Sequence, residues 1–478
     1  MKHKLWALGF WAISMALPII SEANAIVIKS FNGMNKAQAG NWEPSDMGGA
    51  VGPNQVVQFV NNAFQVFDKS GTSLTPVISA QSFWTAAGIS SGVLSPGLSD
   101  PRIIYDADSQ RYFAVQVNVA QTANVGNRVL LAVSNSSDAS AGFKAVDFAG
   151  LNNLTGTAPL ADYPTLGISQ NGVYIGTNNF TNNTTFSSVS LFSIPKADLL
   201  SVSGPDLSSM TRFDNLNPNT RGFTLQAASG ESTTGTVLAI DNLSSNKIDI
   251  TRVTGSGGAG AVMSATSYLT GITDGSPNNQ RQPDGTRTLD GLDQRFGSAV
   301  FQRGHYLYAA NAIGDNQNPN LTTHDMVHWM ILDANTLTLL VQGVISDPNY
   351  DFTFPSIAAN DYGDFMIAYN GSSQSSFVSD YADICHFNGI SVICETPLLL
   401  QTGLGNYHGN FNRWGDYSAA QVDPANPKVF WAFLGYPLAN NQWATSITAI
   451  MEVPEPSTLY LLGLGLVSLR LGTRRIAS

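Results

Sequence analysis

The stretch Asp100–Val119, DPRIIYDADSQRYFAVQVNV, decides the fold. It opens on a charged cluster, continues as a short apolar strand, turns at Asp106–Gln110 and resumes as an aromatic-rich strand. Alternating apolar residues on both sides of a short polar turn predict a β-hairpin. The fold class therefore depends on whether this hairpin recurs along the chain.

Four further segments share this form, and two weaker copies start near Gly48 and Gly222. Each opens on an aromatic, Pro, Gly or Asp cluster and turns between two short strands. Self-similarity at a regular spacing is typical of a repeat architecture. The four segments are Asp162–Phe180, Arg295–Ile313, Phe354–Ser372 and Gly415–Tyr436, with turns at Gln170–Gly172, Gln302–Gly304, Asp361–Gly363 and Asp423–Lys428.

A second hairpin fits after most of these starts, which gives four strands per unit. One four-stranded sheet cannot bury both of its faces, but a closed ring of such sheets can. The sequence therefore predicts an all-β chain folded as a β-propeller, with seven blades as the favoured number. We expect Ile447–Val453 to pair with Ile26–Phe31 and close the ring. Stacked β-sandwiches without a ring are the alternative.

The composition supports a folded and turn-rich β protein. Of 478 residues, 12% are charged and 43% are hydrophobic, which argues against general disorder. The net charge of −11 and the pI of about 4.9 argue against a nucleic-acid partner, because such a partner needs a basic face. Only six of the 34 acidic residues are glutamate. The others are aspartate, which favours turns. No cofactor is expected, although calcium in the loops stays open.

The first 25 residues predict a secretory signal peptide. Lys2 and Lys4 form a basic start, Leu5–Ile20 is apolar, and Ala23-Asn24-Ala25 is a small-x-small cleavage site. Signal peptidase is then a processing partner, and the mature chain enters an oxidising compartment. An uncleaved membrane anchor is the alternative, but the apolar stretch is short for a span.

The last 26 residues combine three features in order. Pro454-Glu455-Pro456 precedes an apolar run, Leu459–Leu469, and basic residues end the chain. Eleven helical residues cover only about 16 Å, roughly half of a bilayer's hydrocarbon core. Such a run could pause in a membrane but would anchor poorly, and a plain membrane helix is the alternative. The basic residues are Arg470, Arg474 and Arg475, which would stay on the cytoplasmic side.

This tail resembles the PEP-CTERM sorting signal of Gram-negative bacteria. The resemblance implies an exosortase as processing partner, transient insertion into the inner membrane, and delivery to the cell surface or extracellular matrix. The expected organisation is a signal peptide (1–25), a β-propeller (26–452) and the sorting signal (453–478). The resemblance says nothing about the activity of the body.

Candidate binding residues come from the clusters that open the units, because these should meet beside the central channel. Converging Arg, Asp and Tyr side chains could bind a sugar acid or a metal. The alternative is that each aspartate caps its own turn or pairs with an arginine of the next blade. The candidates are Asp100, Arg102, Asp162, Tyr163, Arg295, Arg413, Asp416 and Tyr417.

The body also resembles, weakly, exported sialidase-like propeller proteins with BNR-type repeats, through loose echoes of their aspartate turn at Asp106–Phe113 and Asp423–Trp431. That resemblance implies three arginines for a substrate carboxylate and a Tyr–Glu nucleophile pair. Arg102, Arg295 and Arg413 could supply the arginines. The glutamates of the body lie outside the opening clusters: Glu43, Glu231, Glu395 and Glu452.

Three remaining features predict structural roles. Cys385 and Cys394 flank an Asn-Gly turn, so a disulfide across a hairpin is expected. His324 and His328 lie on a predicted strand, where a spacing of four residues separates them by about 13 Å and disfavours a shared metal. His408 fits a loop hydrogen bond better than catalysis.

The sequence thus favours a non-enzymatic surface or matrix protein whose propeller binds polysaccharide or another protein. A secreted, sialidase-like hydrolase that uses the channel-mouth Asp, Arg and Tyr residues is the alternative. The turn-rich loop 274–293 could cover the channel or be a plain insertion.

Overall fold

The computed structural model describes residues 24–453, apart from 96, 120–125, 152–158, 183, 245, 273–274 and 316–323. Residues Ala25–Met451 form one compact unit. Residues 1–23 of the predicted signal peptide, and Pro454, Glu455 and Pro456 of the sorting signal, lie outside the described residues. None of the helices in the described ranges is long and apolar enough to cross a bilayer.

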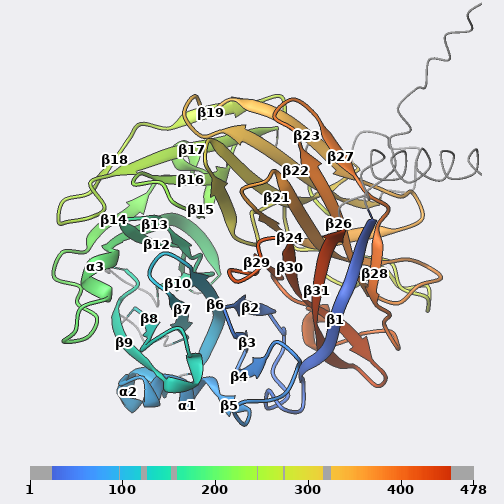
Figure 1. Cartoon of the computed structure of the whole chain (residues 1–478), viewed down its shortest axis with the longest axis horizontal. Coiled ribbons are helices and arrows are strands. Elements are labelled where there is room, and N and C mark those ends of the chain that lie inside the picture. The colour runs from blue at the N-terminus through green and yellow to red at the C-terminus, as the bar shows by residue number, and fades with distance from the viewer. Residues whose placement is uncertain are drawn as a thin grey trace, which may run out of the picture. The chain divides into compact units, whose positions relative to one another are not determined.

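Six hydrogen-bonded sheets make up the described part of this unit. In Figure 1 they are arranged around a common centre, with the first strand of each hairpin innermost. The first sheet contains β2 (Gly48–Val51), β3 (Gln55–Val60), β4 (Ala63–Asp68) and β5 (Ile78–Ser79), and the second contains β6 (Leu98–Asp106), β7 (Arg111–Asn118), β8 (Arg128–Ser134) and β9 (Phe143–Ala149).

The next sheets follow in chain order. One contains β10 (Leu160–Asp162), β11 (Gly167–Ile168), β12 (Gly172–Thr181), β13 (Thr185–Pro195) and β14 (Thr211–Leu216). The largest has nine strands: β15 (Phe223–Ser229), β16 (Gly235–Ile240), β17 (Lys247–Thr254), β18 (Val262–Met263), β19 (Ser267–Thr270), β20 (Val300–Arg303), β21 (Tyr306–Gly314), β22 (Asp325–Asp333) and β23 (Leu339–Ile345). Within it, a parallel pairing of β15 with β20 joins two antiparallel meanders.

The last two sheets complete the arrangement. One contains β24 (Asp351–Ala359), β25 (Asp364–Ser372), β26 (Ser379–Phe387), β27 (Val392–Cys394) and β28 (Leu398–Gln401), and the other contains β29 (Ala419–Val422), β30 (Val429–Leu438), β31 (Gln442–Val453) and β1 (Asn24–Asn35). The described helices are short: α1 (Ala80–Ala86), α2 (Ser91–Leu94), α3 (Lys196–Leu199), α4 (Pro218–Arg221), η1 (Ala139–Ala141) and η2 (Asn410–Asn412).

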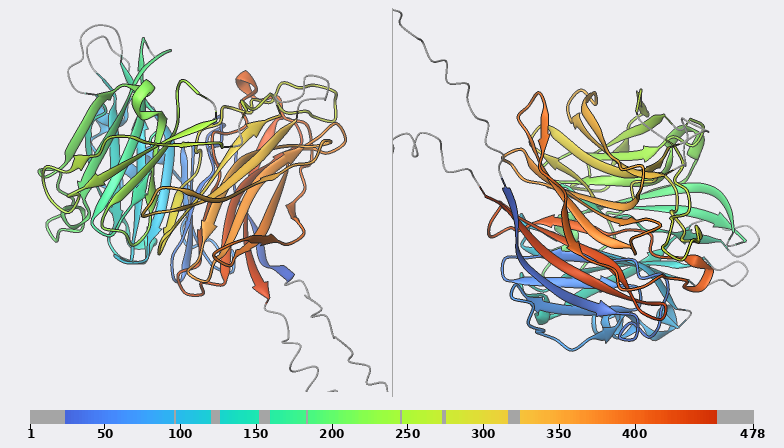
Figure 2. Two further views of the ribbon diagram at one scale, coloured as in Figure 1. Left: turned by 90° about the horizontal axis from the view of Figure 1, so that it is seen from above. Right: turned by 90° about the vertical axis from the view of Figure 1, so that its right-hand side faces the viewer.

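The first and last strands of the chain share one sheet, as the sequence predicts. Strand β1 pairs with β31, and Figure 2 shows the dark blue strand beside the red ones. Side chains reinforce the pairing, because Ser30 Oγ lies 3.0 Å from Thr448 Oγ1 and Thr445 Oγ1 donates to the carbonyl of Met34 at 2.9 Å. The two ends of the body are therefore held together.

Buried apolar side chains form layers between neighbouring sheets. Phe59, Trp84 and Tyr112 pack between the first two sheets, and Phe365 packs with Trp329 between β22 and β25. A further layer, including Phe67 and Trp431, lies between the first and last sheets. Each sheet is covered on both faces by its neighbours, which is how short sheets in a ring remain stable.

A repeated bulge shapes the innermost strands near their start. Asp100, Thr224 and Phe354 have φ values of 59°, 55° and 50°, and the strand register shifts beside each of them. A left-handed residue in a bulge redirects the following side chains, at some conformational cost. This bulge turns the opening clusters toward the centre of the ring.

Asparagines at the ends of second strands support two of these bulges. Asn61 Oδ1 accepts the backbone N–H of Asp100 at 2.9 Å, and Asn178 Oδ1 accepts that of Thr224 at 2.9 Å. Each asparagine belongs to one sheet and satisfies a backbone donor in the next. These buried hydrogen bonds fix neighbouring sheets relative to each other.

Candidate functional site

The predicted site residues lie together at one end of the ring's centre, which we call the cluster end. Tyr163 and Tyr417 are buried and stack against arginines. Arg102 Cζ lies 3.2 Å from the ring centroid of Tyr417 and 4.9 Å from that of Tyr163, while Arg295 Cζ lies 4.2 Å from that of Tyr163. The structure thus brings the opening clusters of different sheets into contact. Ligand binding by these residues stays a prediction.

Three buried aspartates form the centre of this cluster. Carboxylate oxygens of Asp46, Asp100 and Asp416 all lie within 4.8 Å of one another. Asp46 Oδ1 accepts the N–H of Asp416 at 2.9 Å, and its Oδ2 accepts Nδ2 of Asn61 at 2.6 Å. Asp100 Oδ2 accepts the N–H of Tyr163 at 3.1 Å. Much of the acceptor capacity of these carboxylates is used inside the protein.

Sequence reasoning missed Asp46. The first weak copy starts at Gly48 in that reading, two residues after this aspartate. Its φ of 45° places it in the left-handed region, like Asp100 in the second sheet. The signal that could have found it is the Ser45-Asp46 pair, which matches Ser99-Asp100 at the start of the next unit.

Burial and mutual repulsion keep protons on this cluster. Burial, with the nearby charges of Asp416 and Asp100, raises the pKa of Asp46 well above its usual range. Burial and the charge of Asp416 raise the pKa of Asp100. Burial and the charges of Asp100 and Asp416 raise the pKa of Asp162 to about 8. Closely spaced carboxylates in a dry site cannot all ionise without a compensating cation.

Arginines supply part of that compensation. Arg413 pairs with Asp416, and its Nε lies 3.4 Å from Asp290 Oδ2. Arg295 binds both oxygens of Asp293, with Nε donating at 2.6 Å. Arg102 instead donates Nε to the carbonyl of Pro164 at 3.3 Å and Nη1 to that of Gly297. The arginines therefore pair mainly within the protein, two of them with aspartates of their own loops.

A divalent cation is the cofactor that these residues could hold. Carboxylate oxygens are the ligands that calcium prefers, and Asp46, Asp100 and Asp416 are close enough to share one ion. The hydrogen bonds that already engage these oxygens compete with such an ion. The three aspartates therefore form an acidic hydrogen-bonded network.

A cavity of about 510 Å³ lies at the end of the ring's centre opposite the aspartate cluster, where the hairpin turns meet. We call this end the turn end. Six hairpins contribute to its wall, including the turns at Gln170, Asp361 and Asp423. Sequence reasoning placed the binding mouth at the opening clusters, so it missed this cavity. The turn signals marked its residues, but their convergence depends on the ring.

Most of the charged groups in the wall of the turn-end cavity are acidic. Asp106 and Asp108 both accept from Lys196 Nζ at 3.0 Å, and Asp423 Oδ1 accepts from Lys69 at 2.7 Å. Further charged groups are Glu231, Asp361 and Arg303, and Arg303 Nε lies 4.0 Å from Asp361 Oδ1. Apolar patches lie between them, from Ile168, Val422, Pro424 and Pro427.

The two ends are separated by a constriction. A cavity of about 30 Å³ lies between them, lined by Gly48, Gly49, Arg102, Phe301 and Tyr417 among others. That volume holds about one water.

A Tyr–Glu pair is present beside the segment that carries Asp46. Tyr407 donates its hydroxyl to Glu43 Oε1 at 2.9 Å, and Glu43 also pairs with Lys36. The tyrosine is fully buried against Trp414. Burial and the neighbouring carboxylate raise the pKa of Tyr407, which opposes formation of a nucleophilic phenolate. The pair has the geometry of a structural anchor.

The histidines make structural contacts. His328 is buried on β22, with Nδ1 3.0 Å from Asn311 Oδ1 and Nε2 2.9 Å from Gln342 Oε1. Burial lowers the pKa of His328 to about 4. His408 Nε2 lies 2.6 Å from Asp284 Oδ2, so it ties its loop to the turn-rich loop 274–293.

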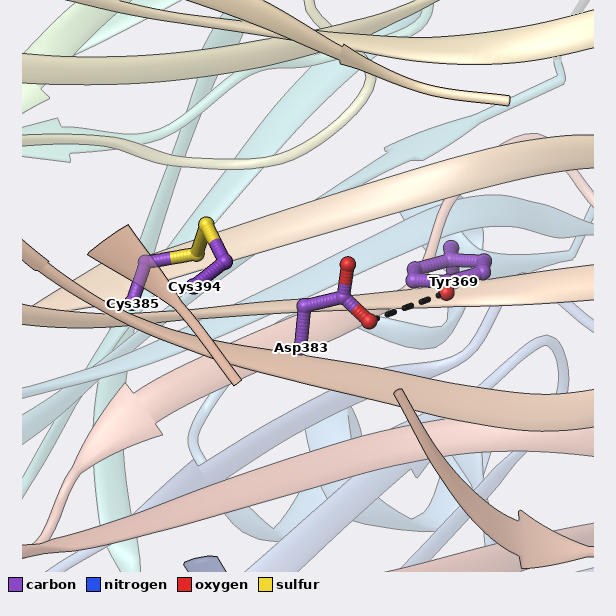
Figure 3. The surroundings of a disulfide bond; sticks show 4 residues. All are labelled: Tyr369, Asp383, Cys385 and Cys394. Carbon is purple, nitrogen blue, oxygen red and sulfur yellow. Dashed lines mark hydrogen bonds between the residues drawn. A yellow bond between two sulfur atoms is a disulfide. The ribbon is translucent and has the colours of Figure 1, made fainter. Parts of the chain in front are cut away.

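Cys385 and Cys394 are joined by a disulfide between β26 and β27. Figure 3 shows its surroundings, where Tyr369 donates its hydroxyl to Asp383 Oδ1 at 3.1 Å. Burial raises the pKa of Asp383 to about 7. The disulfide fixes the outer hairpin of this sheet.

Comparison with known proteins identifies the tail. Residues 452–475 match the PEP-CTERM protein-sorting motif, so this prediction is confirmed. The motif implies export in a Gram-negative bacterium and an exosortase as processing partner. No curated protein matches the chain in sequence.

Solved structures resemble the body only distantly. Semaphorin 1a from Drosophila, extracellular domains 1–2, shares 7% identity over 90% of this chain and 88% of its own, with a TM-score of 0.43. An α-L-arabinanase from Penicillium chrysogenum complexed with arabinobiose shares 9% over 74% and 93%, with a TM-score of 0.32. A subtype N11 neuraminidase-like protein of A/flat-faced bat/Peru shares 9% over 61% and 87%, with a TM-score of 0.28. The chain is all-β and its structural neighbours are propeller-like.

Proposed function

We propose that this protein is an exosortase substrate of the cell surface or extracellular matrix whose β-propeller binds an uncharged polysaccharide at the turn end. A signal peptidase removes residues 1–25, and the tail from residue 453 inserts transiently into the inner membrane before it is cut. The export part of this proposal rests on the PEP-CTERM motif. The binding part rests on the cavity of about 510 Å³.

Seven blades are part of the proposal. The nine-stranded sheet consists of two meanders, so five other sheets and these two halves give seven repeating units among the described residues. Apolar layers between neighbouring units, including the layer with Phe67 and Trp431 between the first and last, support a closed ring. The cluster and turn ends are then the two mouths of the channel.

The composition of the turn-end wall favours a sugar. Carboxylates and amides such as Asp361, Glu231 and Gln170 are suited to pairs of hydroxyl groups, while Pro424 and Val422 offer apolar surface for a sugar ring. Five acidic residues outnumber Arg303 and the two lysines that pair with them, Lys69 and Lys196, which makes the wall unfavourable for an acidic polysaccharide. An uncharged polymer avoids that repulsion.

A glycan hydrolase has less support. Arg102, Arg295 and Arg413 are engaged with carbonyls or aspartates at the cluster end. The Tyr407–Glu43 pair is buried, and its pKa shift opposes nucleophilic attack. We therefore favour a binding module over an enzyme.

Calorimetric titration of the mature chain with dextran and with alginate tests the binding. We expect Glu231→Gln and Asp361→Asn to weaken dextran binding by roughly tenfold each, if each loses about 1.4 kcal/mol of charge-assisted hydrogen bonding. The matched control is Asp347→Asn in the surface turn before β24. Preference for alginate, or no binding of either polymer, would contradict the proposal.

Turnover distinguishes the rival function. Release of reducing sugar by the wild-type chain, abolished in Asp416→Ala and Arg295→Ala variants that keep their circular dichroism spectrum, would establish the hydrolase. Binding without turnover supports the module.

A further inference from the structure

Both ends of the compact unit lie at the turn end. Met451 pairs with Val429 across β30 and β31, and the carbonyl of Val429 accepts the N–H of Asp423, a residue of the cavity wall. The backbone N–H of Ala25 donates to Glu395, whose own N–H binds the carbonyl of Ile384. The chain therefore leaves the body from the face that carries the cavity.

Only a short segment separates this face from the apolar run of the tail. Leu459 follows Met451 by eight residues. A fully extended segment of that length spans about 28 Å at most. When the apolar run is in a bilayer, the turn end is therefore kept close to the membrane surface.

Apolar side chains project from loops on this same face. Val202 is 98% exposed, Ile390 is 88% exposed and Tyr362 is 61% exposed. Tyr362 follows Asp361 of the cavity wall, and Ile390 lies in the hairpin after Phe387, whose N–H binds the carbonyl of Gly363 at 2.8 Å. Single exposed apolar residues are common, but these three lie in loops on the turn-end face.

Basic side chains from neighbouring strands lie beside the loop of Val202, which follows α3. A third cavity, of about 240 Å³, is lined there by Arg111 of β7, Lys144 of β9, Leu199 and Val202 among others. Basic groups beside exposed apolar tips suit the headgroup region of a bilayer.

We propose that in the uncut precursor the turn-end face rests on the bilayer, with Val202, Tyr362 and Ile390 in the headgroup region. This inference rests on the tail insertion that the proposed function includes. The ring then stands with its cavity toward the lipid, and the cluster end faces away. Removal of the tail frees the cavity for polysaccharide, so processing and ligand access are coupled.

Spin labels on the full-length precursor test this orientation. Val202→Cys and Ile390→Cys place a label at the turn end, while Leu243→Cys and Leu404→Cys are matched exposed positions, 71% and 59% exposed, at the cluster end. Leu243 follows β16, whose Ile240 pairs with Phe223 at the start of β15, and Leu404 N–H binds the carbonyl of Pro437 near the end of β30. The native cysteines are paired in the disulfide.

The precursor is reconstituted into vesicles of phosphatidylethanolamine with a minor share of phosphatidylglycerol, recovered by flotation, and measured by electron paramagnetic resonance. We expect the ratio of collisions with oxygen to collisions with an aqueous nickel chelate to rise several-fold at 202 and 390. The control labels keep the ratio of an aqueous site. Equal ratios at all four positions in floated precursor would overturn the orientation and leave the proposed function standing. Failure of the precursor to float would overturn both the tail insertion and this inference.

Discussion

The unfolding free energy of the body is expected to fall as pH rises from 5 to 9, and Asp162 is a main cause. Burial and the charges of Asp100 and Asp416 raise the pKa of Asp162 to about 8 in the folded chain. The unfolded chain releases this proton near pH 4. The stabilisation by this carboxyl is therefore complete below about pH 4 and is lost as pH rises through 8.

The size of the effect follows from the shift. A rise from 3.8 to about 8 is about four pKa units, or at most about 6 kcal/mol at about 1.4 kcal/mol per unit. Asp162 is only partly buried and is coupled to Asp100, so solvent and sharing of the proton reduce this value. Between pH 5 and 9, we expect the unfolding free energy of Asp162→Asn to fall by about 2–3 kcal/mol less than that of the wild type.

Urea unfolding followed by tryptophan fluorescence at several pH values measures this difference. The matched control is Asp206→Asn, because Asp206 is an exposed turn residue whose pKa is lowered by hydrogen bonds from Ser208. Its contribution changes only below about pH 4, so the control slope should equal that of the wild type. Parallel curves for wild type and Asp162→Asn would refute the assignment of a proton to the aspartate cluster.

Further predictions concern the contacts between sheets and the disulfide. Asn61→Ala leaves the N–H of Asp100 without its acceptor and removes the side-chain donor to Asp46, and we expect a loss of about 2 kcal/mol in urea unfolding. Cys394→Ser removes a short loop closure and should cost about 2–3 kcal/mol relative to the disulfide-bonded wild type, while the reduced wild type should match the variant. His328→Gln should change the pH dependence little above pH 5, because burial lowers the pKa of His328 to about 4; a transition near pH 6.5 that disappears in this variant would contradict that.

Much of the strand order was predictable from local patterns. Polar turns such as Asp106–Gln110 and Asp423–Lys428 lie between short apolar runs, and each forms a hairpin turn in the structure. Aspartate caps these turns: Asp423 Oδ1 accepts the N–H of Ala425 at 2.8 Å. The pairing of β1 with β31 was also predictable, because the ring needs one last strand to cover its final sheet.

The site was only partly predictable, because it depends on which ends of the hairpins enclose empty space. The opening clusters meet as expected, but Asp46 joins them from a unit whose start is two residues earlier than the pattern indicates. Arg295 and Arg413 are engaged by Asp293 and Asp416, which a list of residue types cannot show. The turn-end cavity arises from loop lengths and side-chain packing in six hairpins, for which the sequence carries no local signal.

The sharing of one sheet by β1 and β31 has a consequence for secretion. Export delivers the N-terminal strand first, yet its partner is the last part of the body to emerge. Until then Ile26, Val27 and Ile28 belong to an unpaired edge of β-branched residues, which is prone to pair with other chains. The cell must protect this edge for the whole time that about four hundred residues take to cross the membrane, so a periplasmic holding factor would raise the yield of closed rings.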